Sequence, residues 1–275
     1  MSARAVGLVS HPDRPQAAEL GAQVRTALGE HGIEVRTPDP SRASTFAEGL
    51  DVVISLGGDG TMLRAVDLAY EVGVPVLGVN VGQLGYLTEV EPQDLPAALE
   101  RVISGDYEVI ERMVLEITVE SHGPARGKWY ALNEAVLEKV HTGRLVRLEV
   151  EINGSPFTTY AADGVIVATP TGSTAYSFSA RGPIVSPRHR CLLLTPVSPH
   201  MLFDRSLVLD AEESVRFVVC DDRSVVLTAD GLELGNLAGG DAVSCTGGSH
   251  PARIVTFGPR DFHQILKAKF GLSDR

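Results

Sequence analysis

The stretch DVVISLGGDGTMLRAVDLAY, residues 51–70, decides the fold of this chain. Its apolar run, 51–56, is typical of a buried strand, and the glycine-rich segment 57–61 predicts a tight turn. Beyond the turn, apolar residues recur at helical spacing, at Met62, Leu63, Val66, Ala69 and Tyr70. The stretch therefore predicts a strand, a glycine turn and a helix in direct succession, which is the repeating unit of an α/β sheet.

The alternation of strand and helix continues on both sides of this stretch. Residues 5–10 and 33–37 are typical of short strands, and a helix is expected between them, starting at Pro15. Residues 74–80 predict a further strand. Because continuous apolar strands separated by helices form parallel sheets covered on both faces, we expect an N-terminal doubly wound α/β domain over residues 1–112.

The pattern changes after Arg112 from continuous to alternating hydrophobicity. Apolar residues alternate with polar ones over 113–119 and 146–152, and the second run ends in Asn153-Gly154, a strong hairpin signal. We expect a β-rich C-terminal domain over residues 113–257. The final segment, 258–275, carries a short amphipathic helix, and we expect it to pack on the first domain because its apolar face needs cover.

Composition excludes several classes of function. The chain has 275 residues and a formal net charge of −11, so it lacks the basic surface that nucleic acids and anionic membranes attract. No apolar run approaches the ~18 residues of a membrane helix. The three cysteines form no CxxC pair, which favours a reducing compartment. We expect a cytoplasmic protein with no nucleic-acid or membrane partner.

The turn Gly57-Gly58-Asp59-Gly60-Thr61 has the context of a phosphate-binding loop. Glycines let the backbone approach a phosphate, and the start of a helix carries a partial positive charge. The Asp59 carboxylate would repel a phosphate, so it suggests a ligand for Mg²⁺ or an acceptor for the proton of an attacking hydroxyl. The alternative is a tight turn in which Asp59 or Thr61 caps the helix. The turn is not a Walker A loop, because no Gly-Lys-Ser/Thr follows.

A second constellation occupies residues 163–177, DGVIVATPTGSTAYS. An apolar strand leads into a turn rich in hydroxyl groups, which would suit a ribose or a carboxamide, and Tyr176 is available to pack on a base. The alternative is a Ser/Thr-rich turn with Tyr176 in the core.

These motifs resemble known kinases. The glycine turn resembles a superfamily that includes NAD kinases, diacylglycerol and sphingosine kinases, and phosphofructokinases. Residues 163–185 resemble the signature of bacterial NAD kinases nearly residue for residue, and Asn133-Glu134, residues 80–87 and residues 195–200 also match that family's pattern. The resemblance implies a kinase that phosphorylates the 2′-hydroxyl of the adenosine ribose of NAD, giving NADP.

The resemblance also implies roles for individual residues. Asp59 would accept the proton, with Gly57, Gly58, Gly60, Thr61 and Arg64 beside the phosphates or ribose. The binding residues for NAD would be Asn133 and Glu134 on adenosine, Arg144 on a phosphate, Asp163 on the carboxamide, and Thr174, Ala175, Tyr176, Ser177 and Ser179 lining the pocket. The sequence departs from the family pattern at Ala161, Arg181 and Leu232.

The donor is expected to be ATP or polyphosphate, and a homodimer or homotetramer is implied. Because several phosphate charges must meet in an acidic protein whose glycine turn has no lysine, we expect Mg²⁺ or Mn²⁺ to be obligatory. No protein residue is assigned as a metal ligand, since the histidines form no HxH or HExxH pair.

Two other functions remain open from the sequence. A lipid kinase of the diacylglycerol or sphingosine type shares the glycine turn, but it would need a basic or apolar membrane-facing patch. A non-catalytic NAD(P) sensor would share the fold, but it has no use for a carboxylate at the position of Asp59.

Overall fold

The structure, a computed structural model, describes residues 3–39, 45–82, 85–220, 223–259 and 261–272. The chain divides into two compact units. The first consists of Met1–Glu111 together with Ala252–Arg275, and the second of Arg112–Pro251. The second unit is therefore inserted, in sequence, into the first.

The first unit is built on a six-stranded sheet in the order β2-β1-β3-β4-β18-β5. Its strands are β1 (Ala5–Ser10), β2 (Glu34–Arg36), β3 (Val52–Gly57), β4 (Val76–Asn80), β5 (Glu108–Arg112) and β18 (Ala252–Thr256). The pairs β1–β2, β1–β3, β3–β4 and β4–β18 are parallel. Its helices are α1 (Pro15–Glu30), α2 (Asp59–Tyr70), the short 3-10 helix η2 (Pro92–Asp94), α3 (Leu95–Ser104) and α5 (Phe262–Phe270).

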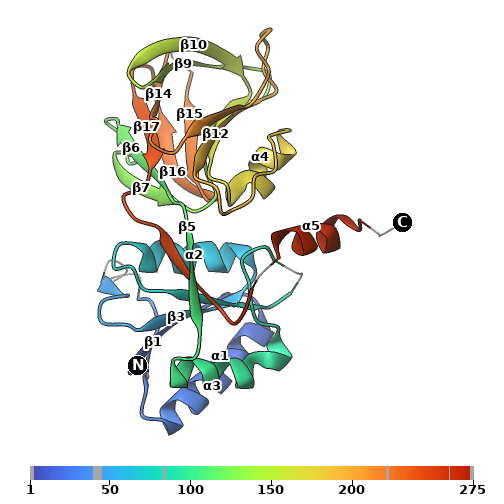
Figure 1. The fold of residues 1–275 in the computed structure, drawn as a ribbon. Helices are drawn as coiled ribbons and strands as arrows, with labels where there is room; N and C mark the ends of the chain where they lie inside the picture. Colours follow the sequence, from blue (N-terminus) through green and yellow to red (C-terminus); the bar gives the residue numbers. More distant parts are fainter. Residues whose placement is uncertain (1–2, 40–44, 83–84, 221–222, 260, 273–275) are drawn as a thin grey trace. The chain divides into compact units, whose positions relative to one another are not determined.

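The chain winds outward from the centre of this sheet in two directions. From β1 it passes through α1 to β2, and from β3 it passes through α2 to β4 on the other side. Figure 1 shows α1 and α3 on one face of the sheet and α2 on the other. The predicted α/β architecture is thus confirmed. The order of the strands reverses between β1 and β3, and ligands of such sheets bind beyond the carboxyl ends of the strands at that point.

Burial explains why these segments form these elements. All six residues of β3 are buried, as expected of a strand covered on both faces. Helix α1 buries Leu20, Val24 and Leu28, which lie on one face. These residues pack with the strands and with the buried face of α3, formed by Leu95, Ala98, Leu99 and Val102.

The second unit is a β-sandwich, so the predicted β-rich architecture is also confirmed. One sheet has the order β10-β9-β14-β17-β6-β7 and the other β13-β12-β11-β8-β15-β16. Strands of the first are β6 (Leu115–Glu120), β7 (Gly127–Ala131), β9 (Val146–Ile152), β10 (Ser155–Ala162), β14 (Val215–Val219) and β17 (Ala242–Gly247). Strands of the second are β8 (Glu134–Lys139), β11 (Gly164–Ala168), β12 (Cys191–Val197), β13 (Leu207–Asp210), β15 (Val225–Ala229) and β16 (Leu232–Leu237).

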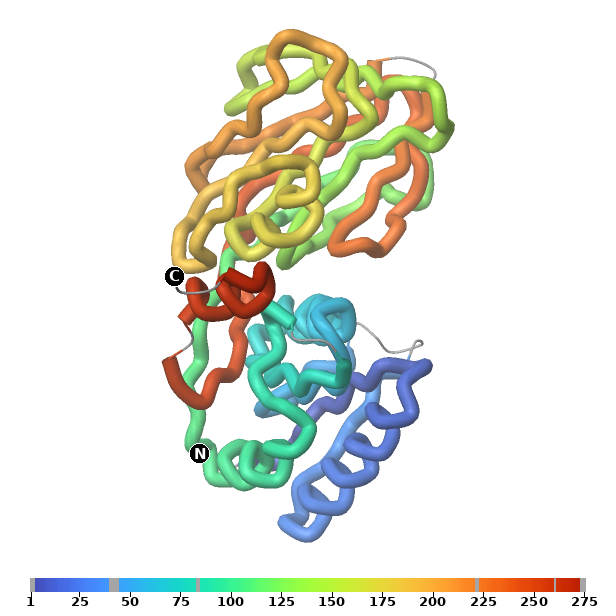
Figure 2. The backbone as a smooth tube through the Cα atoms, turned by 90° about the vertical axis from the view of Figure 1, so that its right-hand side faces the viewer, coloured from blue at the N-terminus to red at the C-terminus, as the bar shows by residue number. Residues whose placement is uncertain are grey.

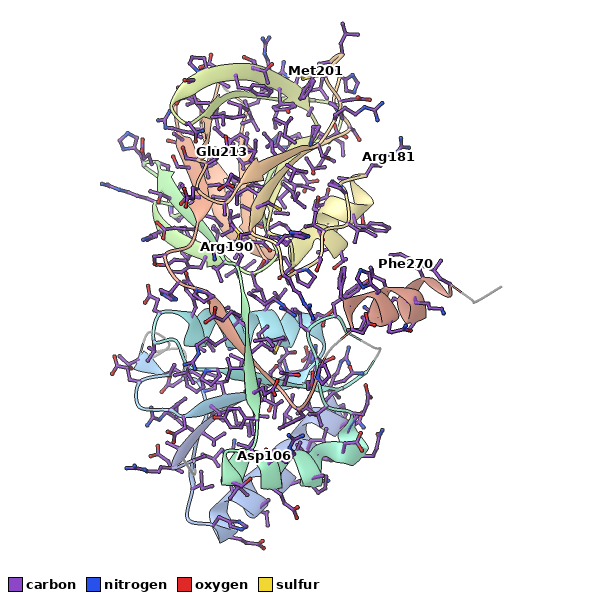
Figure 3. All side chains as sticks on the ribbon, viewed as in Figure 1. Asp106, Arg181, Arg190, Met201, Glu213 and Phe270 are labelled. Atoms are coloured by element: carbon purple, nitrogen blue, oxygen red, sulfur yellow. The ribbon has the colours of Figure 1, made fainter. Side chains whose placement is uncertain are left out.

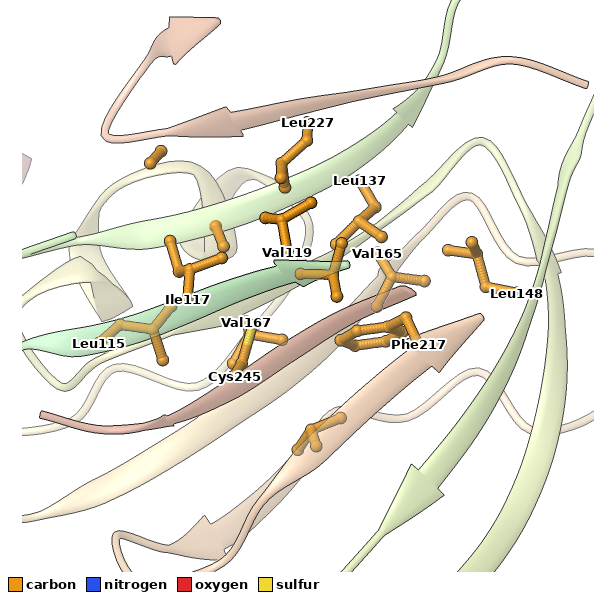
Figure 4. Packing of buried hydrophobic residues seen from close by; sticks show 14 of the residues in the cluster. Leu115, Ile117, Val119, Leu137, Leu148, Val165, Val167, Phe217, Leu227 and Cys245 are labelled. Atoms are coloured by element: carbon orange, nitrogen blue, oxygen red, sulfur yellow. The ribbon is translucent and has the colours of Figure 1, made fainter. Parts of the chain in front are cut away.

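The inner faces of the two sheets share one core. Figure 4 shows Ile117 of β6 and Phe217 of β14, from one sheet, packed with Leu137, Val165 and Leu227 from the other. The predicted turn at Asn153-Gly154 joins β9 to β10, and both of its residues have positive φ angles, 53° and 73°. Such angles fit the type I′ hairpin turn that this dipeptide favours.

The outer face of the second sheet is covered by the segment that follows β11. This segment contains the 3-10 helix η3 (Gly172–Thr174) and the single-turn helix α4 (Tyr176–Ser179). Tyr176, Ala180 and Val185 pack on outward-facing residues of the sheet, including Val136 and Ile166. Because side chains alternate along a strand, Glu134 and Glu138 lie on the same face of β8 as Val136. The sheet therefore presents these two carboxyl groups to the segment around Tyr176.

The last strand corrects the predicted boundary between the domains. The sequence pattern places residues 252–257 in the β-rich domain, but β18 pairs in parallel with β4 in the first sheet. The reason is that a strand with apolar residues on both faces, such as Ile254 and Val255, completes a two-sided parallel sheet better than a sandwich. Figure 2 shows the red segment running beside the green and teal segments of the first unit.

A helix near the C-terminus, α5, is present as expected. Its N-cap, Asp261, accepts hydrogen bonds from the backbone N–H groups of His263 and Gln264. The Lys269 ammonium lies 4.1 Å from the centre of the Tyr86 ring, a cation–π contact with the loop that follows β4. Among the described residues, no helix is long and apolar enough to cross a membrane.

Candidate functional site

A cavity of about 380 Å³ lies at the carboxyl ends of β1 and β3, where the strand order reverses. Two loops line it, the β1–α1 loop and the glycine turn between β3 and α2. Its lining residues are Ser10, His11, Pro12, Arg14, Gly58, Asp59, Gly60, Thr61 and Arg64. The structure thus brings together five of the predicted site residues, and Gly57 immediately precedes them.

Each glycine of the turn has its own steric reason. A Cβ at Gly57 would overlap the Thr61 hydroxyl, so this position has no room for a side chain. A Cβ at Gly58 or Gly60 would meet no atom within 4 Å, because both positions face open space in the cavity. The first amides of α2 have no partner within the helix. The turn therefore offers an uncovered backbone to an anion.

The Asp59 carboxylate is held by the loop that follows β4. Its Oδ2 accepts the N–H of Tyr86 at 2.9 Å, and its Oδ1 accepts the N–H of Leu87 at 3.0 Å. Gly85 packs so closely that a Cβ there would overlap Oδ1. The N-cap of α2 is Gly58, and among the described residues no side chain caps the helix. The alternative in which Asp59 or Thr61 serves as the cap is therefore wrong.

Among the lining residues that the sequence does not predict, His11 and Arg14 carry ionisable side chains. They lie in the loop after β1, which has no glycine-rich signature. The signal that would have found them is topological, since the carboxyl end of β1 adjoins that of β3 once the strand order is known. In the motif at residues 80–87, Gln83 and Leu84 lie outside the described residues.

In the second unit, the Asn133-Glu134 pair is fixed by a neighbouring turn. The Asp230 carboxylate accepts the backbone N–H groups of Leu132, Asn133 and Glu134 at 2.7, 2.8 and 3.1 Å. Asp230 itself has a φ of 49°, in the left-handed region that a tight turn requires. A Cβ at Gly172 would overlap the Asn133 carbonyl oxygen. The pair is therefore clamped between two turns.

Glu134 is a buried carboxyl group with one oxygen unsatisfied. Its side chain is 7% exposed, and Oε2 has no hydrogen-bond partner within the described chain. Burial, and then the charge of Asp230, raise the pKa of Glu134 to about 8, although the Tyr176 backbone N–H donates to the carboxylate and acts in the opposite direction. Glu134 therefore holds a proton at neutral pH in this state.

Tyr176 and Asp163 lie in one polar cluster with two residues of β8. The Tyr176 hydroxyl donates to Glu138 Oε1 at 2.6 Å, and the Lys139 ammonium is paired with the Asp163 carboxylate at 2.5 Å. Burial, the hydrogen bond to Glu138 and the charges of Glu138 and Asp163 raise the pKa of Tyr176 to about 12. Tyr176 is thus a neutral hydrogen-bond donor. Its ring is half-buried against the sheet, and its hydroxyl group lies in the polar cluster.

Arg144 lies on a separate, smaller cavity of about 140 Å³. Lys139, His141 and Arg223 also line this cavity, and Lys139 connects it to Asp163. The cavity is therefore basic, which is unusual on a chain of net charge −11. This surface suits an anionic group such as a phosphate.

The segment 174–179 contributes residues of two kinds. Ser177 is fully buried, and its hydroxyl is hydrogen-bonded to that of Thr195 at 3.2 Å, so its side chain has a packing role. Thr174 and Ala175 are half-buried, and Ser179 is exposed. These three residues and Tyr176 can therefore meet a ligand, whereas Ser177 is closed to solvent.

The departures from the family pattern have visible consequences. Arg181 adopts a φ of 67°, and its exposed side chain projects away from α4 (Figure 3). Gly182 is needed where it stands, because a Cβ there would overlap the Ser177 hydroxyl. Leu232 is 61% exposed at the start of β16. Its apolar side chain offers no amide to a ligand at that position.

No group of three or more potential metal-ligating side chains occurs in the part of the chain that the structure describes. Asp59 is the only carboxylate among the described residues that line the larger cavity. A metal ion at this site would need donor phosphates as additional ligands, the usual arrangement for Mg²⁺.

Comparison with known proteins identifies the class first. Residues 38–107 match the ATP-NAD kinase N-terminal domain, and residues 132–257 match the ATP-NAD kinase C-terminal domain. The two units together thus define a two-domain kinase.

Relatives and solved structures then give the family. The chain is 42% identical to a NAD kinase of Heliobacterium modesticaldum, covering 96% of this chain and 97% of the relative. It is 40% identical to NAD kinase 2 of Streptomyces avermitilis, covering 98% and 95%. The yeast NADH kinase complexed with NADH matches with a TM-score of 0.89 at 27% identity, covering 100% of this chain and 90% of that one. A NAD kinase from Archaeoglobus fulgidus in complex with ATP matches with a TM-score of 0.73 at 25% identity, covering 98% and 97%. This chain belongs to the NAD kinase family. The matches support neither the lipid kinase nor the sensor.

Proposed function

We propose that this chain transfers a phosphoryl group to the 2′-hydroxyl of the adenosine ribose of NAD, with Asp59 as the proton acceptor. The observation that carries the proposal is a carboxylate fixed by two backbone amides inside a cavity otherwise lined by a glycine turn, two arginines and a histidine. In a member of the NAD kinase family, this is the place where an acceptor hydroxyl and donor phosphates would meet.

Asp59 is suited to general base catalysis by its hydrogen bonds. Each carboxylate oxygen accepts one N–H group and keeps a second lone pair for a substrate hydroxyl. The two amides fix the orientation of the carboxylate, so little reorganisation is needed when the hydroxyl arrives. The proton of the 2′-hydroxyl would pass to Asp59 as the new P–O bond forms.

The donor is proposed to be ATP, with inorganic polyphosphate as the second candidate. A related NAD kinase from Archaeoglobus fulgidus has been solved in complex with ATP, which supports a nucleoside triphosphate. Polyphosphate shares the phosphate chain that Gly58, Gly60 and Arg64 would contact, so the same residues would bind either donor. Direct comparison of the two donors decides between them.

A divalent cation, Mg²⁺ or Mn²⁺, is proposed to accompany the donor. The cavity is compatible with this arrangement, because Mg²⁺ keeps several waters and can take most of its other ligands from the donor phosphates, so that Asp59 stays available as the proton acceptor. When bound, the cation would neutralise charge on the donor phosphates.

The second unit is proposed to bind NAD. Asn133 and Glu134 would contact the adenosine portion, and Glu134, neutral at pH 7, would act there as a hydrogen-bond donor. Tyr176, with Thr174, Ala175 and Ser179 beside it, would pack on the ligand, whereas Ser177 would support this segment from below. Asp163 would contact the carboxamide and Arg144 a phosphate. The likeness to the yeast NADH kinase, solved with NADH, supports a dinucleotide ligand.

The cellular setting is also a proposal. We propose a cytoplasmic location, since the cysteines Cys191, Cys220 and Cys245 are all free thiols. A homodimer or homotetramer is proposed from the family pattern.

The decisive experiment is an assay for NADP with the purified protein. The protein is incubated with NAD, Mg²⁺ and either ATP or polyphosphate, and NADP is measured with an NADP-specific dehydrogenase. NADP should form with the wild type and be lost in Asp59→Asn. In parallel, labelled ATP is offered with diacylglycerol and with sphingosine. Label appearing in lipid, with no NADP formed, would refute the proposal.

A further inference from the structure

Arg14 is a cation of the larger cavity to which the proposed reaction assigns no role. It lies in the β1–α1 loop, immediately before the first helical residue, Pro15. We propose that the Arg14 guanidinium binds the phosphate groups of the donor and, with Asp59, defines the two sides of the donor subsite. This inference rests on the proposed function and adds a phosphate-binding residue to it.

The position of the side chain points to this role. The Arg14 guanidinium lies against Gly82, because a Cβ at Gly82 would overlap Nη1. Gly82 follows β4, whereas Arg14 follows β1, and β3 lies between these two strands in the sheet. The arginine therefore reaches across the carboxyl end of β3, where the glycine turn begins.

Gly82 makes this path possible. Its φ of 132° is accessible mainly to glycine, and its missing side chain leaves the space that the guanidinium occupies. A second close approach, of Gly85 to the Asp59 carboxylate, occurs on the same loop. The loop after β4 thus contacts Arg14, the proposed phosphate-binding residue, through Gly82, and Asp59, the proposed base, through Gly85.

Among the residues that the structure describes, none pairs with the charge of Arg14. Its side chain is half-buried, and among the described residues it forms neither an ion pair nor a hydrogen bond. Other arginines of this acidic chain do find carboxylates, as in the pairs Arg36–Glu34, Arg101–Asp106 and Arg216–Glu120. Partial burial of an unpaired charge is unfavourable, and an anionic ligand would relieve it.

The chemistry of the group suits a phosphate chain. A guanidinium presents a planar fork of N–H donors that matches two phosphate oxygens at once. Charge on the phosphoryl oxygens must be stabilised during the transfer, and the glycine turn has no lysine to do so. Arg64, exposed on α2 at the same cavity, supplies a second cation.

The first test measures anion binding without any reaction. Binding of inorganic tripolyphosphate to the full-length protein is followed by calorimetry for the wild type, Arg14→Ala and Arg14→Lys. Arg25→Ala is the matched control, because Arg25 is exposed on α1 and the substitution removes the same charge. We expect affinity to fall about 10- to 100-fold in Arg14→Ala, as for loss of charged hydrogen bonds. Arg14→Lys should fall by less, and Arg25→Ala should match the wild type.

The second test separates donor binding from NAD binding. In Arg14→Ala the KM for ATP should rise by about tenfold or more, while the KM for NAD stays within about twofold of the wild type. Thermal unfolding of Arg14→Lys, which keeps the packing stem and the charge, checks that the fold is intact. Unchanged tripolyphosphate affinity in Arg14→Ala, or an equal rise in both KM values, would overturn the inference.

The two tests also keep this inference apart from the proposed function. A wild type that binds tripolyphosphate through Arg14 but forms no NADP would leave the phosphate site standing and remove the proposed reaction. If the wild type forms NADP and Arg14→Ala is indistinguishable from Arg25→Ala in both tests, the proposed reaction stands and the phosphate-binding role of Arg14 is refuted.

Discussion

At the scale of single residues, the chemistry depends on two carboxyl groups in different environments. Asp59 accepts two backbone N–H groups at the rim of a cavity. Glu134 is buried, has one unsatisfied oxygen and lies near the charge of Asp230. The first is arranged to act as a charged acceptor and the second as a neutral acid. Substitution by the corresponding amide, which is neutral, therefore changes the charge of Asp59 but keeps Glu134 in the uncharged form.

The substitution Asp59→Asn should reduce kcat by about 10²–10⁴, because it removes the proton acceptor and leaves the turn in place. An amide can accept only one of the two backbone N–H groups, so the free energy of unfolding should also fall by about 1 kcal/mol. Steady-state kinetics and urea unfolding measure the two effects. Substantial recovery of kcat at high Mg²⁺ would instead identify Asp59 as a metal ligand.

The substitution Glu134→Gln should change how stability depends on pH. The ordinary pKa of 4.5 applies to the unfolded chain, and the folded value is about 8. Between these values the folded state binds more protons, so the contribution of Glu134 to stability is full below pH 4.5 and is lost as pH rises towards 8. Each tenfold difference in proton affinity is worth about 1.4 kcal/mol.

Urea unfolding of the wild type and of Glu134→Gln at several pH values checks this prediction. The stability of the wild type relative to the variant should decrease from pH 4.5 to 8. A difference that does not vary with pH would mean that Glu134 ionises as an ordinary carboxyl group.

At the scale of elements, the segments after strands position the site. The turn after β11 packs Gly172 on the Asn133 carbonyl, and the turn after β15 brings Asp230 to the three amides at the start of β8. These contacts join elements that are far apart in sequence. The Asn133-Glu134 pair therefore depends on two turns that contain neither residue.

Gly172→Ala should destabilise the protein by at least about 1–3 kcal/mol, because the new methyl group meets backbone atoms that cannot rotate away. It should also raise the KM for NAD by displacing Asn133. Gly29→Ala is the control, since a Cβ at Gly29 has nothing within 4 Å. Differential scanning calorimetry measures the first effect, and equal unfolding temperatures in the two variants would contradict the expected clash.

Sequence periodicity predicted the elements whose pattern is local. The strands expected at residues 5–10 and 51–56, the helix expected to begin at Pro15 and the hairpin expected at Asn153-Gly154 are all present. The helix α3 was not expected, although Leu95, Ala98, Leu99 and Val102 have helical spacing. The position of β18 was also missed, because nothing local distinguishes a strand that pairs with its neighbours from one that pairs with β4 far along the chain.

The site residues, like the elements, were predictable where their signal is local in the sequence. The composition of the glycine turn indicated Asp59 as a candidate functional residue, since a carboxylate in a phosphate-binding loop requires an explanation. Arg14 and Asp230 carried no such signal, because their roles arise from strand order and from a turn packed against a distant strand. Contacts of this kind follow from topology, which one sequence does not specify.

At the scale of the whole molecule, charge governs the reaction. A chain of net charge −11 must accept a donor with several negative charges into a cavity that itself contains Asp59. Activity should therefore be abolished by excess EDTA and restored by Mg²⁺ or Mn²⁺, because the cation offsets this repulsion. The NADP assay measures both steps. Full activity in excess EDTA would show that Arg14 and Arg64 suffice without a cation.

The return of the chain to its first sheet has a consequence for biosynthesis. In the finished sheet β18 stands between β4 and β5, so β5 has no neighbour until the ribosome has made residues 252–256. The sandwich, by contrast, is one continuous segment, Arg112–Pro251, and is complete when that segment has emerged. Domains made first usually fold first, but here the order is reversed. We expect the sheet of the first unit to stay incomplete, with the edge of β4 open to wrong partners, until residues 252–256 have been made and pair with it.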